Sequence, residues 1–133
     1  FPACLGLQGN WHGLAHGAGK GDGAEKLGRF DQLLAQQLSR FLQRLNETPE
    51  QSGSMLDNTL VFYGSSNSKT HNNTNYPLIL AGGKSMGFKH NQFLRPGANV
   101  PLSNVFVTML EAMGIPHEGF ADSTGELADL RRS

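Results

Sequence analysis

The sequence has one cysteine, no net charge and no long apolar run, and each shortage excludes a class of protein. Because Cys4 is alone, no disulfide framework can hold the chain together. Eleven basic residues offset eleven acidic ones, so we expect neither a nucleic-acid surface nor a strongly charged partner. No apolar stretch approaches the roughly 18 residues that a membrane span needs, so we expect no membrane-spanning helix.

The common local signatures of catalysis are also missing. The sequence has no G-x-S-x-G, no phosphate-binding P-loop, no dinucleotide fingerprint, no C-x-x-C pair and no internal repeat. What it has is 133 residues with abundant glycine, which is enough for one loop-rich domain with a single core. The chain starts at Phe1 without an initiator methionine, so residues 1–133 are expected to be a single domain or a fragment of a longer protein.

Two helices and two short strands are predicted from the apolar pattern. Residues 22–46 form a long helix in this prediction, because leucine and phenylalanine recur at spacings of three and four. Residues 59–63 and 78–81 are short apolar runs without alternation, which is typical of strands buried on both faces. Together with a second helix at residues 101–114, this order predicts an α/β fold in which helices cover a parallel or mixed sheet.

The helix predicted at residues 101–114 has an apolar face and recognisable ends. Ser103 is a candidate N-cap, and Gly114 stands where helices commonly end in a left-handed residue. The methionines of this helix are expected to fill the core. Its apolar face consists of Leu102, Val105, Phe106, Met109, Leu110 and Met113.

The polar loop between the two strands, residues 64–76, is the first candidate site. It is rich in serine, asparagine and threonine, and it contains His71. Open α/β sheets bind ligands at the carboxyl ends of their strands, so a polar loop at that place predicts a binding site. An ordinary solvated turn has the same composition, and both interpretations stay open.

Residues 1–23 are glycine-rich and have no apolar period, so they are predicted to be a loop. A pair of histidines in this segment is the second candidate site. His12 and His16 are four residues apart, which is one helical turn and places both imidazoles on one face. Such a pair can reach a single metal ion. Two loop histidines without a ligand are the alternative.

A family resemblance is carried by two segments, LDNTLVFYGSSNSKTHNNTNYPLILAGG and PLSNVFVTMLEAMGIP. They resemble the C-terminal part of a family of secreted bacterial proteins, the domain of unknown function fifteen fifty-two. That family is related to the alkaline phosphatase-like superfamily, which includes phosphatases, sulfatases and cofactor-independent phosphoglycerate mutases. The resemblance, which runs from about Trp11 to about Leu130, implies the C-terminal portion of an alkaline phosphatase-like fold and a secreted or periplasmic location.

The resemblance also implies a metal site. His71, six residues before Pro77, matches the last metal-ligand histidine of the superfamily. His12 and His16 match the place of its Asp-x-x-x-His ligand pair. The Asp-His pair expected after the first strand is replaced by Ser65-Ser66-Asn67, which removes two ligands of the usual second metal. The resemblance therefore implies one divalent ion, with zinc favoured by a set of three histidines.

Two functions follow from the resemblance, and both stay open. The first is a metal-dependent, hydrolase-like domain acting on phosphate or sulfate esters, in which Ser66, Asn67 and Asn72 contact a small anionic substrate. The second is a non-catalytic binding or structural domain that kept the scaffold and lost the active site. The nucleophile of the superfamily lies in an N-terminal half that has no match here, so the expected partner is that half of the same protein or another subunit.

Overall fold

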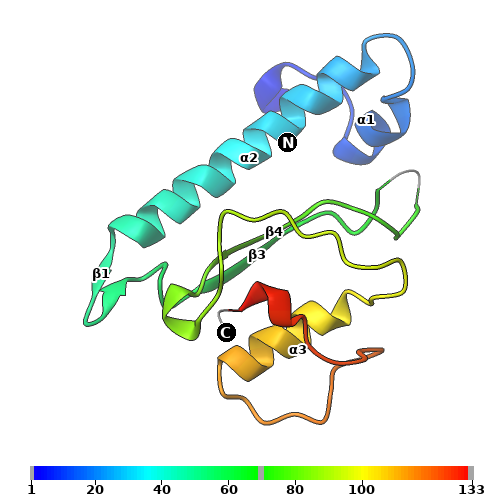
Figure 1. Cartoon of the computed structure of the whole chain (residues 1–133). Coiled ribbons are helices and arrows are strands. Elements are labelled where there is room, and N and C mark those ends of the chain that lie inside the picture. The colour runs from blue at the N-terminus through cyan, green and yellow to red at the C-terminus, as the bar shows by residue number, and fades with distance from the viewer. Residues whose placement is uncertain (1, 69–70, 132–133) are drawn as a thin grey trace. The chain divides into compact units, whose positions relative to one another are not determined.

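A computed structural model describes residues 2–68 and 71–131 of the chain (Figure 1). Within these residues the structure is mixed α/β, which confirms the predicted class at this level. The predicted long helix and both predicted strands are present to within one or two residues at each end. The helices are α1 (Trp11–Gly17), α2 (Gly23–Glu47) and α3 (Ser103–Ala112), with short 3₁₀ helices η1 (Pro2–Leu5), η2 (Lys84–Met86) and η3 (Ala128–Leu130). The strands are β1 (Pro49–Glu50), β2 (Gly53–Ser54), β3 (Leu60–Gly64) and β4 (Leu78–Gly82).

The strands form two small antiparallel sheets. In the first, β1 pairs with β2 so that Pro49 lies opposite Ser54 and Glu50 opposite Gly53. In the second, β3 pairs with β4. Antiparallel pairing joins β3 and β4 as a hairpin, whereas parallel strands would need a long crossover connection. No parallel pair is found among the described strands, so the predicted parallel or mixed sheet is wrong for these residues, which form antiparallel pairs.

The chain divides into two compact units, each of which combines segments distant in sequence. The first unit contains residues 1–44 and 63–78, and the second contains residues 45–62 and 79–133. The first unit holds α1, most of α2 and the loop that joins β3 to β4. The candidate histidines therefore all belong to one unit.

The first unit is held together around α2, the long helix in Figure 1. The Arg29 guanidinium donates a hydrogen bond of 2.8 Å to the main-chain oxygen of Leu5, which ties η1 to this helix. The apolar core is small, and Leu7 and Phe30 are its buried side chains among the described residues. At the turn from α1 to α2, a Cβ on Gly23 would overlap the main-chain carbonyl of Gly17, so glycine allows this close approach.

The second unit contains α3, whose fully buried face is not the apolar one. Its buried side chains are Ser103, Asn104, Val107 and Thr108. The apolar stripe predicted to fill the core is half-buried instead, and Met113 is 45% exposed. The expectation that this methionine fills the core was therefore wrong.

The buried polar face of α3 binds the C-terminal segment. Ser103 donates a hydrogen bond of 2.6 Å to Asp122, so its hydroxyl does not cap the helix as predicted. Asn104 exchanges two hydrogen bonds with Thr124, and Thr108 accepts one from the Leu127 N–H. Buried polar groups need such partners, and the C-terminal segment supplies them.

The end of α3 agrees with the prediction. Gly114 has a φ of 65°, and its N–H donates to the Glu111 carbonyl while the Ile115 N–H donates to the Leu110 carbonyl. These two bonds are those of a Schellman motif, in which a left-handed glycine ends the helix.

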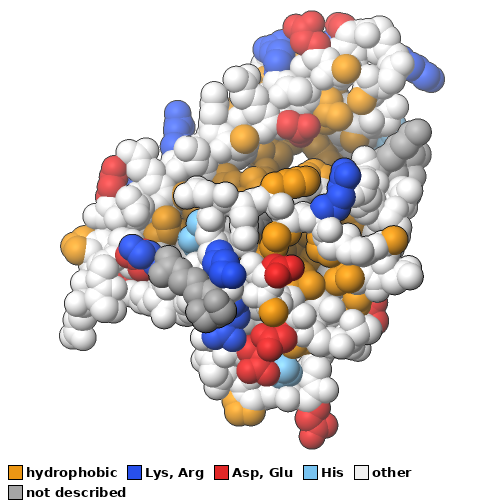
Figure 2. Space-filling model, in the orientation of Figure 1, with side chains coloured by type: hydrophobic (Ala, Val, Ile, Leu, Met, Phe, Trp, Pro, Cys, Tyr) orange, Lys and Arg blue, Asp and Glu red, His pale blue; other side chains and the backbone are white. Residues whose placement is uncertain are grey.

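Charges of both signs are intermixed on the described part of the face that Figure 2 shows. This distribution agrees with the balanced composition of the chain. Among the described residues, no helix combines the length and the apolar character that a membrane span requires.

Candidate metal centre

Helix α1 places His12 and His16 side by side. The N–H of Gly13 donates a hydrogen bond of 2.8 Å to the side-chain oxygen of Asn10, which caps the first turn. One helical turn separates the two histidines, and their ring centroids lie 4.6 Å apart with the planes inclined by 66°. Both side chains are exposed. The predicted one-face arrangement of the pair is confirmed, and it is built by a helix where the sequence had suggested a loop.

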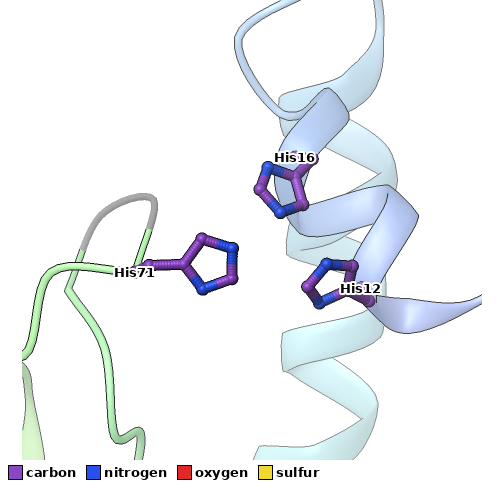
Figure 3. Close-up of side chains that lie close together, drawn as sticks. All are labelled: His12, His16 and His71. Carbon is purple, nitrogen blue, oxygen red and sulfur yellow. The ribbon is translucent and has the colours of Figure 1, made fainter.

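His71 reaches the same place from the loop between β3 and β4. Figure 3 shows its ring pointing toward the rings of His12 and His16. The His71 centroid lies 5.6 Å from that of His12 and 5.1 Å from that of His16. One ring nitrogen from each histidine can be chosen so that all three lie within 4.8 Å of one another. The residues that the resemblance joined as ligands therefore converge.

The two strands of the hairpin that carries His71 lie very close together where the loop begins and ends. A Cβ on Gly64 would lie 2.6 Å from the Pro77 carbonyl oxygen and 3.1 Å from the Cα of Leu78, so only glycine allows the two chains to come so close. Further out, the Ser68 N–H donates a hydrogen bond of 2.8 Å to the main-chain oxygen of Asn72. These contacts bring the two arms of the hairpin together on either side of the loop tip.

The donor set fits a divalent transition metal. Zinc binds histidine nitrogen at about 2.0–2.1 Å and favours tetrahedral coordination, which places two ligand nitrogens roughly 3.4 Å apart. The observed limit of 4.8 Å is wider, and rotation of exposed imidazole rings about their side-chain bonds can bring the nitrogens closer. Three neutral imidazoles suit zinc, cobalt, nickel or copper, whereas calcium and magnesium prefer oxygen ligands.

The three-histidine set leaves a coordination position for an external ligand. Tetrahedral zinc with three protein ligands keeps its fourth position for water or substrate, which is the arrangement of catalytic rather than structural sites. Among the residues that the structure describes, no Asp, Glu or Cys side chain joins the set to fill that position. All three histidines are exposed, so the position is accessible to solvent.

The predicted substrate residues lie on the same loop as His71. Ser66, Asn67 and Asn72 are all exposed. Asn67 donates a hydrogen bond of 3.2 Å to the Ser66 hydroxyl, so these two side chains are joined to each other. The Asn72 side-chain oxygen accepts two bonds from Thr74, of 3.0 Å from its N–H and 2.7 Å from its hydroxyl. Residues 69 and 70 of this loop lie outside the described residues.

Among the described residues, three carboxyl groups have shifted pKa values, and none belongs to the histidine set. A hydrogen bond from Lys26, 2.8 Å away, lowers the pKa of Asp22. Burial raises the pKa of Asp31 on α2. Hydrogen bonds from the Ser54 N–H and hydroxyl lower the pKa of Asp57. Each shift has a local structural cause and does not by itself mark a catalytic acid.

Sequence reasoning missed Asn10. Its signal was present, because asparagine is a favoured N-cap and stands two residues before the histidine that begins the pair. The frequent glycines of this segment predict a loop, and they outweigh the capping signal.

No family model, no curated protein and no solved structure matches this chain. The kinship with the alkaline phosphatase-like superfamily stays a prediction, and the candidate metal site rests on the geometry of its own residues.

Proposed function

We propose that this chain is a metal-binding, hydrolase-like domain that holds one divalent ion, zinc by preference, with His12, His16 and His71. The observation that carries the proposal is the convergence of three ring nitrogens within 4.8 Å from segments more than fifty residues apart. Helix geometry alone explains why His12 and His16 are close. It does not explain why a third exposed histidine, from the tip of a polar hairpin, points at the same spot.

An ion in this site would supply Lewis-acid chemistry, with an open position where water or an anionic oxygen can bind. The chain's own residues would bind and orient the substrate. The Ser66 hydroxyl and the side-chain amides of Asn67 and Asn72 are exposed donors on the loop that carries His71, and donors of this kind suit phosphate or sulfate oxygens. Phosphate and sulfate esters are the substrate class that the family resemblance implies.

The wider setting of the proposal also follows from that resemblance. In it, the chain is the C-terminal part of an alkaline phosphatase-like fold, in which helices cover a larger parallel or mixed sheet. The N-terminal half of the same protein, or another subunit, completes the sheet and supplies the nucleophile. The protein is then a secreted or periplasmic bacterial protein.

A non-catalytic metal-binding or structural domain is the second candidate, and one observation favours it. Where the superfamily has an Asp-His pair, this chain has Ser65-Ser66-Asn67, and no carboxylate among the described residues joins the histidine set. A second metal would therefore lack ligands here. A domain that kept the scaffold and one ion without turning over a substrate would have this residue pattern.

The test of the proposal is a zinc titration of the chain purified without a polyhistidine tag. Isothermal titration against a competing chelator should give one equivalent of bound zinc. His71→Ala should weaken binding by at least about 100-fold, because loss of a ligand exceeds the 10–100-fold effect of an outer-shell partner. Its fold should change little, because His71 is exposed on a loop.

His90→Ala is the matched control, since His90 is another exposed histidine that is not part of the set. It should bind zinc as the natural chain does. Equal zinc affinity in His71→Ala and His90→Ala would refute the site. A screen with phosphate and sulfate esters then separates the two candidates. It is run on the full-length protein, which includes the half that supplies the nucleophile. Zinc-dependent turnover there supports the hydrolase, and stoichiometric zinc without turnover there supports the non-catalytic domain.

A further inference from the structure

Among the described residues, no carboxylate supports the three histidines in the way that outer-shell partners support many metal ligands. A ligating histidine normally donates its other ring N–H to a carboxylate, a carbonyl or water, and this bond fixes the ring. Burial can fix a ring as well. Here all three side chains are exposed, and among the described residues no carboxylate joins the set. The backbone that carries each ring is therefore the main means by which the described residues can hold the geometry.

Asn10 holds the backbone of the first two ligands. Its side-chain oxygen accepts from the Gly13 N–H at 2.8 Å, and its main-chain oxygen accepts from the Leu14 N–H at 3.1 Å. Helix α1 has only seven residues, and isolated helices that short are marginal in water. A single N-cap therefore has a large share in whether the turn between His12 and His16 forms.

Asn72 holds the backbone of the third ligand. His71 has a φ of 59°, in the left-handed region that non-glycine residues seldom adopt. Such a conformation persists only where neighbouring structure fixes it. Asn72 follows directly, and its side-chain oxygen accepts both the N–H and the hydroxyl of Thr74. Its main-chain oxygen accepts from the Ser68 N–H, so bonds on both sides of His71 meet at one residue.

We propose that Asn10 and Asn72 are positioning residues of the metal site, each acting through the backbone of the histidines and neither binding the ion. This inference rests on the proposed metal-binding function and adds to it the source of the site's preorganisation. In this proposal, the oxygen and the nitrogen of the Asn72 side chain have different roles. The side-chain oxygen builds the turn, and the amide N–H₂ is the end that a substrate would contact.

The test compares zinc affinities of four single variants with that of the natural chain. Asn10→Ala and Asn72→Ala should each weaken zinc binding by about 3–10-fold, because loss of a cap of this kind typically shifts a local equilibrium by about fivefold. Asn10→Ser keeps a capping oxygen and should restore the natural affinity. Asn73→Ala removes a neighbouring exposed asparagine whose side chain makes no hydrogen bond with the described residues, and it should leave the affinity unchanged.

Cobalt spectra distinguish positioning from ligation. At saturating cobalt, Asn10→Ala and Asn72→Ala should give the same visible absorption spectrum as the natural chain, because the three ligands are retained. His71→Ala should change that spectrum. A changed spectrum in either asparagine variant would mean that the residue is a ligand, and it would overturn the positioning role.

Thr74→Val tests how Asn72 acts and provides a milder change if Asn72→Ala disturbs the fold. It removes one of the two donors to the Asn72 oxygen, so its effect should be smaller than that of Asn72→Ala. The double variant with Asn72→Ala and Thr74→Val should bind zinc no more weakly than Asn72→Ala alone, because both substitutions disrupt the same turn. Natural zinc affinity in Asn10→Ala, Asn72→Ala and Thr74→Val would overturn the inference and leave the metal site intact. Absence of zinc binding in the natural chain would overturn the proposed function itself, and this inference with it.

Discussion

Thr108→Val tests whether the polar face of α3 holds the second unit together. Thr108 is completely buried, and its hydroxyl accepts a 2.8 Å hydrogen bond from the Leu127 N–H while donating one of 2.8 Å to the Asn104 carbonyl. Valine has nearly the same shape, so the substitution removes the hydroxyl without leaving a cavity. What it leaves is a part-buried N–H on Leu127 without its partner.

The expected effect can be worked from that lost bond. An unsatisfied buried donor costs about 1–3 kcal/mol, so the free energy of unfolding should fall by about 2 kcal/mol in Thr108→Val. Thr108→Ser is the matched control, because it keeps the hydroxyl and loses one methyl group, which corresponds to about 0.8 kcal/mol. For a chain of this size the melting temperature should fall by roughly 6–10 °C in the valine variant, and by less than half of that in the serine variant.

Urea denaturation followed by circular dichroism measures both variants, and hydrogen exchange at the Leu127 amide reports the bond directly. Protection of that amide should be lost in Thr108→Val and kept in Thr108→Ser. The order of the two stabilities is decisive. A serine variant less stable than the valine variant would mean that apolar packing, and not the hydrogen bond to the C-terminal segment, is what Thr108 contributes.

Two further predictions concern Asp57 and the glycines. The lowered pKa of Asp57, caused by hydrogen bonds from Ser54, means that its contribution to stability is present above pH 4 and is lost as the pH falls through the lowered value. Urea midpoints between pH 6 and pH 2 should therefore fall more steeply for the natural chain than for Asp57→Asn, and parallel curves would remove the assignment. Gly64→Ala should destabilise the chain by about 1–3 kcal/mol, because its Cβ would lie 2.6 Å from the Pro77 oxygen. Gly28→Ala should stabilise it by about 1 kcal/mol, because Gly28 is exposed in the second turn of α2 and a Cβ there would meet no neighbouring atom. Equal urea midpoints for the two alanine variants would contradict this reading of the hairpin base.

The sequence predicted the elements of this fold better than their burial. The spacing of leucine and phenylalanine located α2, and the apolar runs located β3 and β4, because local periodicity carries that information. The buried face of α3 was assigned by the same rule and was wrong. Ser103, Asn104 and Thr108 are buried because a segment some twenty residues later supplies their hydrogen-bond partners. Periodicity carries no information about a partner so distant in sequence.

In the candidate site, too, local sequence predicts some features and not others. The spacing of His12 and His16 is enough to place them on one helical face, so their proximity could be predicted from local sequence. The place of His71 beside them depends on how the hairpin lies in the first unit, which no local pattern specifies. Only the family resemblance suggested it. The structure places the three histidines close together, and this observation does not depend on the resemblance.

The loop that carries His71 also shows why residue type alone could not assign roles within it. Asparagine, serine and threonine bind substrates through the same oxygen and nitrogen atoms with which they build turns. Asn72 was predicted to contact substrate, and its side-chain oxygen is already bonded to Thr74. The side-chain amide of Asn67 donates a hydrogen bond to the Ser66 hydroxyl. A substrate role for either residue is therefore a statement about particular atoms, and it holds only for those that the turn leaves available or that an incoming anion can draw away from it.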